Sequence, residues 1–124
     1  MTRAFLILIA FIFAAYGVAC ILDPSLPARL AGLQITNGDG YAEMSAMYGG
    51  LQTGVGVFCL LGAFRSSMER SVLLLLVLGI GLLAATRALG ALRTEEVLTV
   101  YTWGALAFET FVTAAAAALL SRAR

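Results

Sequence analysis

Three ionisable residues interrupt otherwise apolar stretches of the sequence, and their types are the ones that could do chemistry. Glu43, Arg87 and Glu109 each lie within or at the edge of a segment long enough to cross a membrane. A charge at the bilayer centre costs about 2.5–3.5 kcal/mol on insertion scales, so such a residue is expected to face other helices and to find a partner. We therefore predict a buried cluster of Glu43, Arg87 and Glu109, with Arg87 as the partner of both acids.

The excess of two acids over one base indicates acid–base chemistry. Desolvation and a neighbouring like charge both favour the neutral form of a carboxyl group, so one of the two acids is expected to stay protonated. A protonated carboxyl can donate to a ligand carbonyl or move a proton, which makes Glu43 and Glu109 the candidate catalytic residues. The structural alternative is a salt bridge that fixes helix register and, for Glu43, a favourable acid in a first helical turn.

Side chains at helical spacing from the acids would share a face with them, and Tyr48 and Gln52, one turn apart, supply a further polar pair. The predicted ligand-binding residues are Glu43, Met47, Tyr48, Gln52, Arg87, Thr102, Glu109 and Thr113. Three aromatic residues near the outer interface, Tyr41, Tyr101 and Trp103, could line the same cavity. An interfacial belt is the more ordinary role for such aromatics.

The remaining reactive residue types are few. All eight basic residues are Arg, and the chain has no His, which excludes imidazole chemistry and Schiff-base lysine. Cys20 and Cys59 are expected near opposite leaflets, so we predict no disulfide, and two isolated thiols predict no metal site. No cofactor is predicted. A net charge of +1 without a basic cluster also argues against nucleic-acid binding.

The composition indicates that lipid surrounds the chain. Of its 124 residues 61% are hydrophobic and 12% charged, and a small soluble fold could not hide that much apolar surface. A span needs about 20 apolar residues, and four windows satisfy this, approximately 4–22, 41–64, 71–92 and 97–120. Only helices satisfy their backbone polar groups in this setting. We predict a single all-α domain, residues 1–124, folded as an integral membrane four-helix bundle.

The connection between the first two windows has its own pattern. Leu26, Leu30 and Leu33 repeat at helical spacing, which predicts a short interfacial helix followed by a polar turn and cap at residues 36–40. Asp23-Pro24 is a natural helix stop, so the first segment is expected to be a retained span and not a cleaved signal peptide.

Arginine is distributed unevenly about the predicted spans. Five arginines flank one side and two the other, which by the positive-inside rule places both termini in the cytoplasm of a cell whose inner membrane holds the protein. The five are Arg3, Arg65, Arg70, Arg122 and Arg124, and the two are Arg29 and Arg93.

Glycines are concentrated in the second and third windows, where they are expected to favour tight helix contacts over lipid exposure. They are Gly49, Gly50, Gly54, Gly56, Gly79, Gly81 and Gly90. Gly50 and Gly54 form a GxxxG pattern, for which packing within the chain is favoured over dimerisation.

The segment Glu43-Met44-Ser45-Ala46-Met47-Tyr48-Gly49-Gly50-Leu51, with Asp23-Pro24 before it and Arg87 and Glu109 after it, resembles a bacterial family, the domain of unknown function 4345. The resemblance extends over essentially the whole chain. It departs from the family at Ser45, where an Arg is often found, which weakens any role for a second membrane cation. The family's broader likeness to DoxX-like four-helix proteins implies architecture more than activity.

Three functions stay open. The first is binding of a lipophile such as a quinone, a sterol-like molecule or an isoprenoid in an outer-facing pocket with the charged cluster at its polar end. The second is a stabilising subunit of a membrane complex, marked by a flat, Gly-rich surface. The third is an acid–base enzyme of the isomerase type acting on a lipophilic substrate. The expected partners are a membrane lipid or lipophilic small molecule, with a second copy or another membrane protein as further possibilities.

Overall fold

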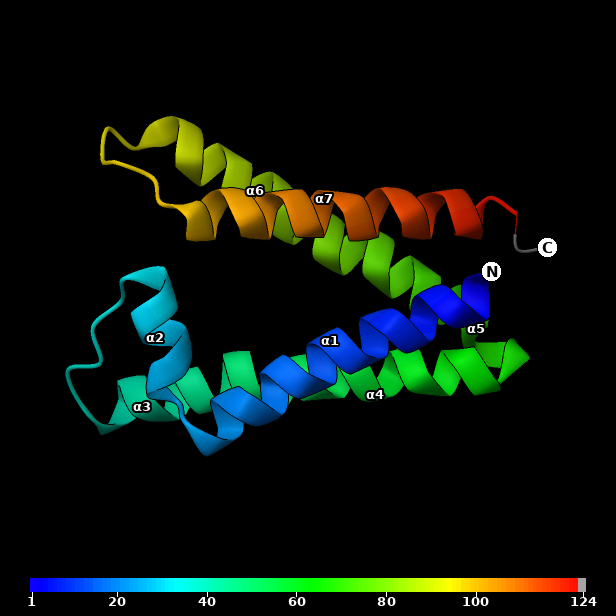
Figure 1. Cartoon of the computed structure of the whole chain (residues 1–124), viewed down its shortest axis with the longest axis horizontal. Helices are drawn as coiled ribbons and strands as arrows, with labels where there is room; N and C mark the ends of the chain where they lie inside the picture. The colour runs from blue at the N-terminus through cyan, green and yellow to red at the C-terminus, as the bar shows by residue number, and fades with distance from the viewer. Residues whose placement is uncertain (123–124) are drawn as a thin grey trace. The chain divides into compact units, whose positions relative to one another are not determined.

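The computed structural model describes residues 1–122, and every regular element within them is a helix. Four helices are long and apolar enough to cross a membrane, namely Thr2–Leu22, Gly38–Phe64, Ser66–Arg93 and Val100–Leu120. These confirm the all-α class and the four predicted spans, and they are typical of a small multi-pass membrane protein. The chain divides into two compact units, Met1–Arg65 and Ser66–Arg124 (Figure 1). A single four-span bundle stays a prediction.

The helices extend beyond or fall short of the apolar windows at several ends. The second begins at Gly38 and not at 41, the third at Ser66 and not at 71, and the fourth at Val100 and not at 97. Apolar windows measure the length that suits lipid, whereas helix ends follow caps and turns. Asn37, for example, caps the second helix by accepting a 2.9 Å hydrogen bond from the Gly40 amide.

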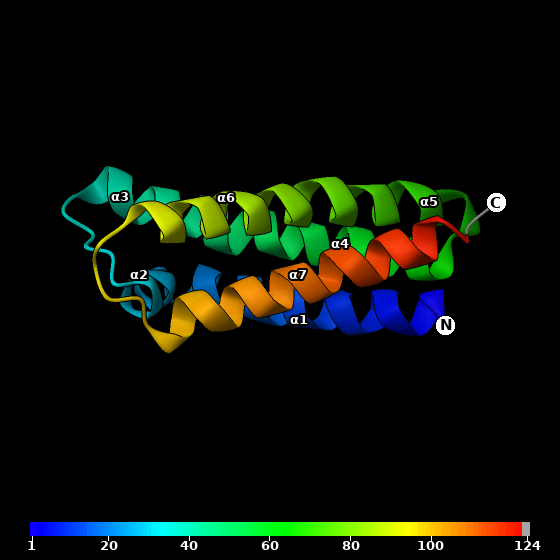
Figure 2. The same ribbon diagram turned by 90° about the horizontal axis from the view of Figure 1, so that it is seen from above.

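The first unit is a helical hairpin with a short helix in its connection. Its elements are α1 (Thr2–Leu22), α2 (Ser25–Ala31), α3 (Gly38–Met44), the π-helical turn η1 (Ser45–Gly50) and α4 (Leu51–Phe64). α1 runs antiparallel to α4 along its length (Figure 2). The Arg3 guanidinium lies 4.5 Å from the centre of the Phe64 ring, which joins the start of α1 to the end of α4.

Small residues bring α1 and α4 into backbone contact. A Cβ on Gly17 would lie 2.4 Å from Thr53 Oγ1 and 2.9 Å from the Gly49 carbonyl oxygen, and a Cβ on Gly56 would lie 2.7 Å from the Ala14 nitrogen. Helices this close can form weak Cα–H···O contacts, which are a recurring feature of close helix pairs. The interface therefore depends on glycine at both positions.

The expectation that all the glycines make tight contacts is wrong for several of them. Gly50 and Gly54, the GxxxG pair, are exposed, and a Cβ on Gly54 would meet no atom within 4 Å. Gly79 and Gly90 are exposed as well. The residues that pack, such as Gly49, lie on another face of the same helix, so spacing alone selected the wrong glycines.

Cys20 and Cys59 are both buried free thiols. Cys20 lies near the end of α1 and Cys59 lies well along α4. Because Gly17 packs against Thr53 and Ile21 against Gly49, Cys20 is level with the start of α4. That level is about nine residues, or roughly 14 Å, from Cys59 along the helix axis. No disulfide can span that separation.

The connection after α1 is held by a clasp made of Asp23, Ser25 and Arg29. Asp23 Oδ1 accepts from the Ser25 amide at 3.1 Å and from the Ser25 hydroxyl at 2.5 Å, while Arg29 Nη2 lies 2.8 Å from Asp23 Oδ2. Arg29 Nη1 also donates to the Ser25 hydroxyl oxygen. Gly32 then caps the end of α2, and its φ of 70° is the left-handed conformation that glycine adopts without strain. Leu30 and Leu33 stay exposed on this segment.

The clasp predicts a pH dependence of stability in this connection. The hydrogen bond from the Ser25 hydroxyl, followed by the bonds from Arg29, lowers the pKa of the Asp23 carboxyl below its ordinary value of 3.8. The clasp therefore contributes stability that is fully present above the ordinary pKa and is lost as pH falls through the lowered one. We expect Asp23→Asn to melt below the wild type at neutral pH, and the two midpoints to converge as pH falls from about 5 to about 2. A difference in melting temperature that stays constant over this range contradicts the assignment.

The second unit is also a hairpin. Its elements are α5 (Ser66–Leu75), the π-helical turn η2 (Leu76–Ile80), α6 (Gly81–Arg93) and α7 (Val100–Leu120). The buried residues of α7 recur with the ordinary three- and four-residue alternation at Glu109, Val112, Ala116 and Leu119. On the opposite helix, Leu76, Ile80 and Ala84 are buried at intervals of four. The wider i→i+5 turn at η2 absorbs the additional residue and keeps this face against α7.

Candidate functional site

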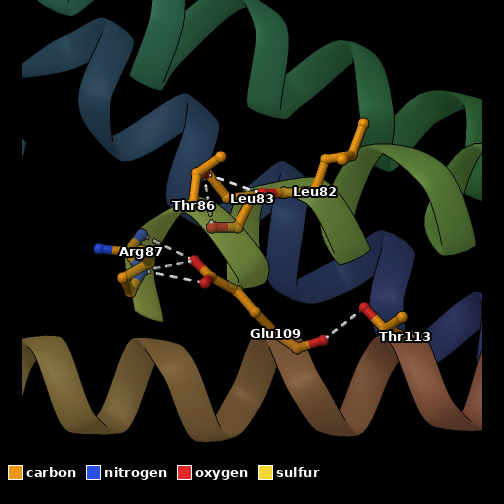
Figure 3. A network of polar contacts seen from close by, with 6 residues as sticks. All are labelled: Leu82, Leu83, Thr86, Arg87, Glu109 and Thr113. Atoms are coloured by element: carbon orange, nitrogen blue, oxygen red, sulfur yellow. Dashed lines mark hydrogen bonds and ion pairs between the residues drawn. The ribbon is translucent and has the colours of Figure 1, made fainter. Parts of the chain in front are cut away.

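The candidate site is an ion pair between α6 and α7 in the second unit. Arg87 Nε lies 2.9 Å from Glu109 Oε2 and 3.1 Å from Oε1, and Arg87 Nη2 lies 2.7 Å from Oε1. Figure 3 shows the guanidinium of Arg87 directed at the carboxylate of Glu109 from the neighbouring helix. This forked arrangement is the strong, geometrically specific form of an Arg–carboxylate contact.

The pair lies deep along the spanning helices. Glu109 is nine residues into α7 from Val100, which places it about 14 Å from that helix end in a hydrocarbon core of roughly 30 Å. Its side chain is 7% exposed, whereas that of Arg87 is 25% exposed. The Glu109 side chain is thus enclosed, and the Arg87 side chain is the more accessible of the two. Two charges at this depth are costly unless each satisfies the other.

Two further side chains surround the pair. The Thr113 hydroxyl donates to the backbone carbonyl of Glu109 at 2.8 Å, one turn back along α7 (Figure 3). Its methyl group faces α6, because a Cβ on Gly81 would lie 3.1 Å from Thr113 Cγ2. The Tyr101 ring centre lies 5.9 Å from the Arg87 guanidinium, within range of a cation–π contact. Gly81 therefore permits the close helix approach that brings the two charges together.

The structure distributes the predicted site residues over both units. Arg87, Thr102, Glu109 and Thr113 belong to the second unit, and Thr102 is half-buried in the first turn of α7. Glu43, Met47, Tyr48 and Gln52 belong to the first unit. The prediction that Arg87 pairs with Glu109 agrees with the observed contact. The participation of Glu43, which is exposed in α3, stays a prediction.

The predicted site residues of the first unit depend on regular α-helical spacing, and the structure departs from that spacing at η1. Met47 and Tyr48 lie in η1, whose hydrogen bonds run from residue i to i−5. A π turn holds an additional residue, so positions after it are rotated relative to those before it. The face that Glu43 shares with Met47 and Gly50 in a regular helix is therefore interrupted. π turns of this kind are frequently associated with functional sites.

Sequence reasoning did not assign two of the polar contacts seen in the structure. Tyr101 was expected in an interfacial belt, yet its ring lies beside Arg87. It precedes Glu109 by eight residues, or about two turns, which is the signal that could have placed the two on one face of α7. The clasp of Asp23 with Arg29 was also missed, although Ser25 and Arg29 have the i, i+4 spacing of a helical pair.

The geometry of the Arg87–Glu109 pair indicates which ligand groups it could bind. Arg87 contacts both oxygens of Glu109, so the two side chains satisfy one another as a forked ion pair. The pair is neutral as a unit, and the Arg87 side chain is 25% exposed. A guanidinium can donate hydrogen bonds to a neutral oxygen acceptor. Within residues 1–122 no group of three or more His, Cys, Asp or Glu could hold a metal ion.

Comparison with known proteins agrees with the resemblance seen in the sequence. Residues 1–120 match the domain of unknown function DUF4345, which is almost the whole chain. No curated protein and no solved structure matches it. The match includes both hairpins and the Arg87 and Glu109 pair. The chain belongs to the DUF4345 family.

Proposed function

We propose that this protein binds a lipophilic small molecule whose polar end meets the Arg87–Glu109 pair. The observation that carries the proposal is a forked ion pair about midway along α7, in a chain whose spanning helices contain few other charges. Ionisable residues at this depth are rare and are associated with ligand or ion pathways. Simple helix packing would be served by apolar side chains at lower cost.

The charge of the pair restricts the polar end of the ligand. Arg87 and Glu109 neutralise one another, so an anionic or cationic group bound there would add an unbalanced charge in a low-dielectric setting. A neutral acceptor avoids that cost. The carbonyl of a quinone or the hydroxyl of an isoprenoid alcohol or sterol has this chemistry, and Arg87, whose side chain is 25% exposed, would donate to it. The ring of Tyr101 beside the guanidinium offers a flat apolar contact.

The setting proposed for this activity is the inner membrane of a cell, with both termini in the cytoplasm. Arg3 and Arg65 are at the same end of the first hairpin, since Arg3 stacks on Phe64 next to Arg65. In the second unit, Arg70 lies in α5 at the start of its spanning helix. An accumulation of arginine at span ends marks the cytoplasmic side.

The test compares ligand-induced stabilisation of the wild type with that of the double variant Arg87→Met/Glu109→Met. Purified protein in detergent is titrated with a short-chain ubiquinone and, separately, with farnesol, and the melting temperature is followed. We expect a saturable rise of several degrees for the wild type with one of them and none for the double variant. The matched control, Arg93→Gln/Glu96→Gln, removes the same two charge types from exposed positions and should respond as the wild type does.

A second candidate, a subunit of a membrane complex, is favoured by the exposed glycines of the second spanning helix. Gly50 and Gly54 lie one turn apart with open space beside Gly54, and small residues so spaced let another helix approach closely. The same purified samples separate the candidates. If neither ligand shifts the wild type, and the protein elutes as a complex that Gly54→Leu dissociates, the binding proposal is overturned in favour of the subunit.

A further inference from the structure

An apolar groove lies on the first unit. It has a volume of about 280 Å³ and is lined only by residues of α1 and α4. Its base is formed where Gly56 meets Ala10 and Ala14, with a hypothetical Cβ on Gly56 only 2.9 Å from the Ala14 Cβ. The walls are larger side chains, among them Ile7, Phe11, Val57 and Leu60. The hollow thus follows from small residues at the point of closest helix contact.

The groove has the properties of a site for hydrocarbon. None of its lining side chains carries a polar group, so nothing in it could orient a ring carbonyl or a hydroxyl. Its volume is slightly below the range of about 300–1,000 Å³ that encloses drug-sized ligands. Phe11 is 71% exposed and Val57 50% exposed, so the groove opens to the surroundings along its length. A single acyl chain lying along the helices fits these conditions.

The Arg3 guanidinium lies at one end of the groove. Arg3 precedes Ile7 by one turn of α1, and Phe64 follows Leu60 by one turn of α4, so both residues continue the walls of the groove. The Arg3 guanidinium lies 4.5 Å from the Phe64 ring centre, which positions it at this end. Among residues 1–122 no carboxylate forms an ion pair with Arg3. A stacked guanidinium keeps its N–H donors in a plane suited to forked binding of phosphate.

We propose that the α1–α4 groove binds an anionic phospholipid, with one acyl chain along Ile7, Phe11 and Val57 and the phosphate on Arg3. The apolar walls account for the acyl chain, and Arg3, which forms no ion pair within residues 1–122, accounts for the anionic phosphate. A zwitterionic lipid carries its own cation, which weakens its attraction to Arg3. The site is in the first unit and shares no residue with the Arg87–Glu109 pair, so each proposal can fail without the other.

The experiment reads lipid selectivity from quenching of a tryptophan in the groove. The single Trp103 is replaced by Phe, and Phe11→Trp is introduced as the probe. The protein is reconstituted with brominated phosphatidylglycerol or brominated phosphatidylcholine in unbrominated mixtures of the two. We expect the relative association constant at Trp in position 11 to favour phosphatidylglycerol about fivefold, from one arginine beside a lipid phosphate. A control probe, Phe111→Trp on the exposed face of α7, should show a ratio close to one.

Two variants separate the parts of the proposal. Arg3→Gln should bring the ratio at the groove probe to about one, whereas Arg93→Gln in the other unit should leave it unchanged. Val57→Phe, which fills the groove and keeps Arg3, should also abolish the preference, whereas Val18→Phe outside the groove should not. The proposal is overturned by a ratio near one in the unmodified groove, or by a preference that survives Arg3→Gln. A preference for phosphatidylglycerol that survives Val57→Phe overturns the claim that the acyl chain lies in the groove.

Discussion

Replacing Arg87 with Met is expected to destabilise the protein by about 3 kcal/mol at neutral pH, the lower part of the range for breaking a buried ion pair. The cause is the carboxylate left behind, because the Glu109 side chain is 7% exposed and loses all three contacts from Arg87. The lower part of the range applies because Arg87 itself is 25% exposed. The measurement is the free energy of unfolding of the protein in bicelles.

A double-mutant cycle separates the pair from either residue alone. Arg87→Met/Glu109→Met should recover most of the lost stability, since two apolar side chains of similar length carry no unpaired charge into the membrane. Arg93→Met removes an exposed arginine at the end of α6 and is expected to change stability by less than about 0.5 kcal/mol. The cycle also needs Glu109→Met alone. If the loss of stability in the double variant equals the sum of the losses in Arg87→Met and Glu109→Met, the ion pair contributes nothing as a unit.

Gly17→Leu is expected to destabilise the first hairpin by about 3 kcal/mol or more, beyond ordinary overpacking of a core. The reason is that the added side chain meets backbone. A Cβ at this position would lie 2.5 Å from the Thr53 nitrogen and 2.9 Å from the Gly49 carbonyl oxygen. α1 and α4 must therefore separate along their length, which also loosens the burial of Phe13 and Cys20 on the same face of α1. Unfolding free energies of the two proteins measure the effect.

Gly54→Leu is the matched control for this prediction, because it places the same side chain on the partner helix where a Cβ meets no atom within 4 Å. Its effect should be small, since leucine also has a higher helix propensity than glycine. The second control is Gly17→Leu combined with Thr53→Ala. This change removes the hydroxyl but not the backbone nitrogen, so it should restore little stability. Full rescue by Thr53→Ala would show that the Thr53 side chain, and not the backbone, limits the approach.

The contact between Arg87 and Glu109 could be predicted because charged residues are scarce in the spans. Only a few ionisable groups lie inside apolar segments, and the cost of an unpaired charge there leaves each with few partners. The cap at Asn37 could be predicted for a similar local reason, since an Asn before a helix start satisfies its orphan amides. The contact of Tyr101 with Arg87 and the clasp at Asp23 were not predicted. Spacing indicates which residues share a helix face, but the side-chain directions that form these two contacts come from the tertiary structure.

The glycines show where sequence reasoning fails. Gly49, Gly50, Gly54 and Gly56 look equivalent in a list of small residues, and the GxxxG spacing singles out Gly50 and Gly54. In the structure Gly49 and Gly56 pack against α1, and the GxxxG pair is exposed. Which face of a helix is buried depends on the shape of its neighbour, and that neighbour is distant in sequence.

The sequence by itself determined the helical class and the four apolar segments, and it predicted the contact between Arg87 and Glu109. These follow from local sums, because transfer to lipid is additive over about 20 residues and an isolated charge must find a partner. Only the tertiary structure decided which small residues meet, where the π turns η1 and η2 shift the faces of two helices, and where the groove beside Gly56 opens. These features arise from the fit of two helix surfaces, which residue spacing along one chain segment does not specify.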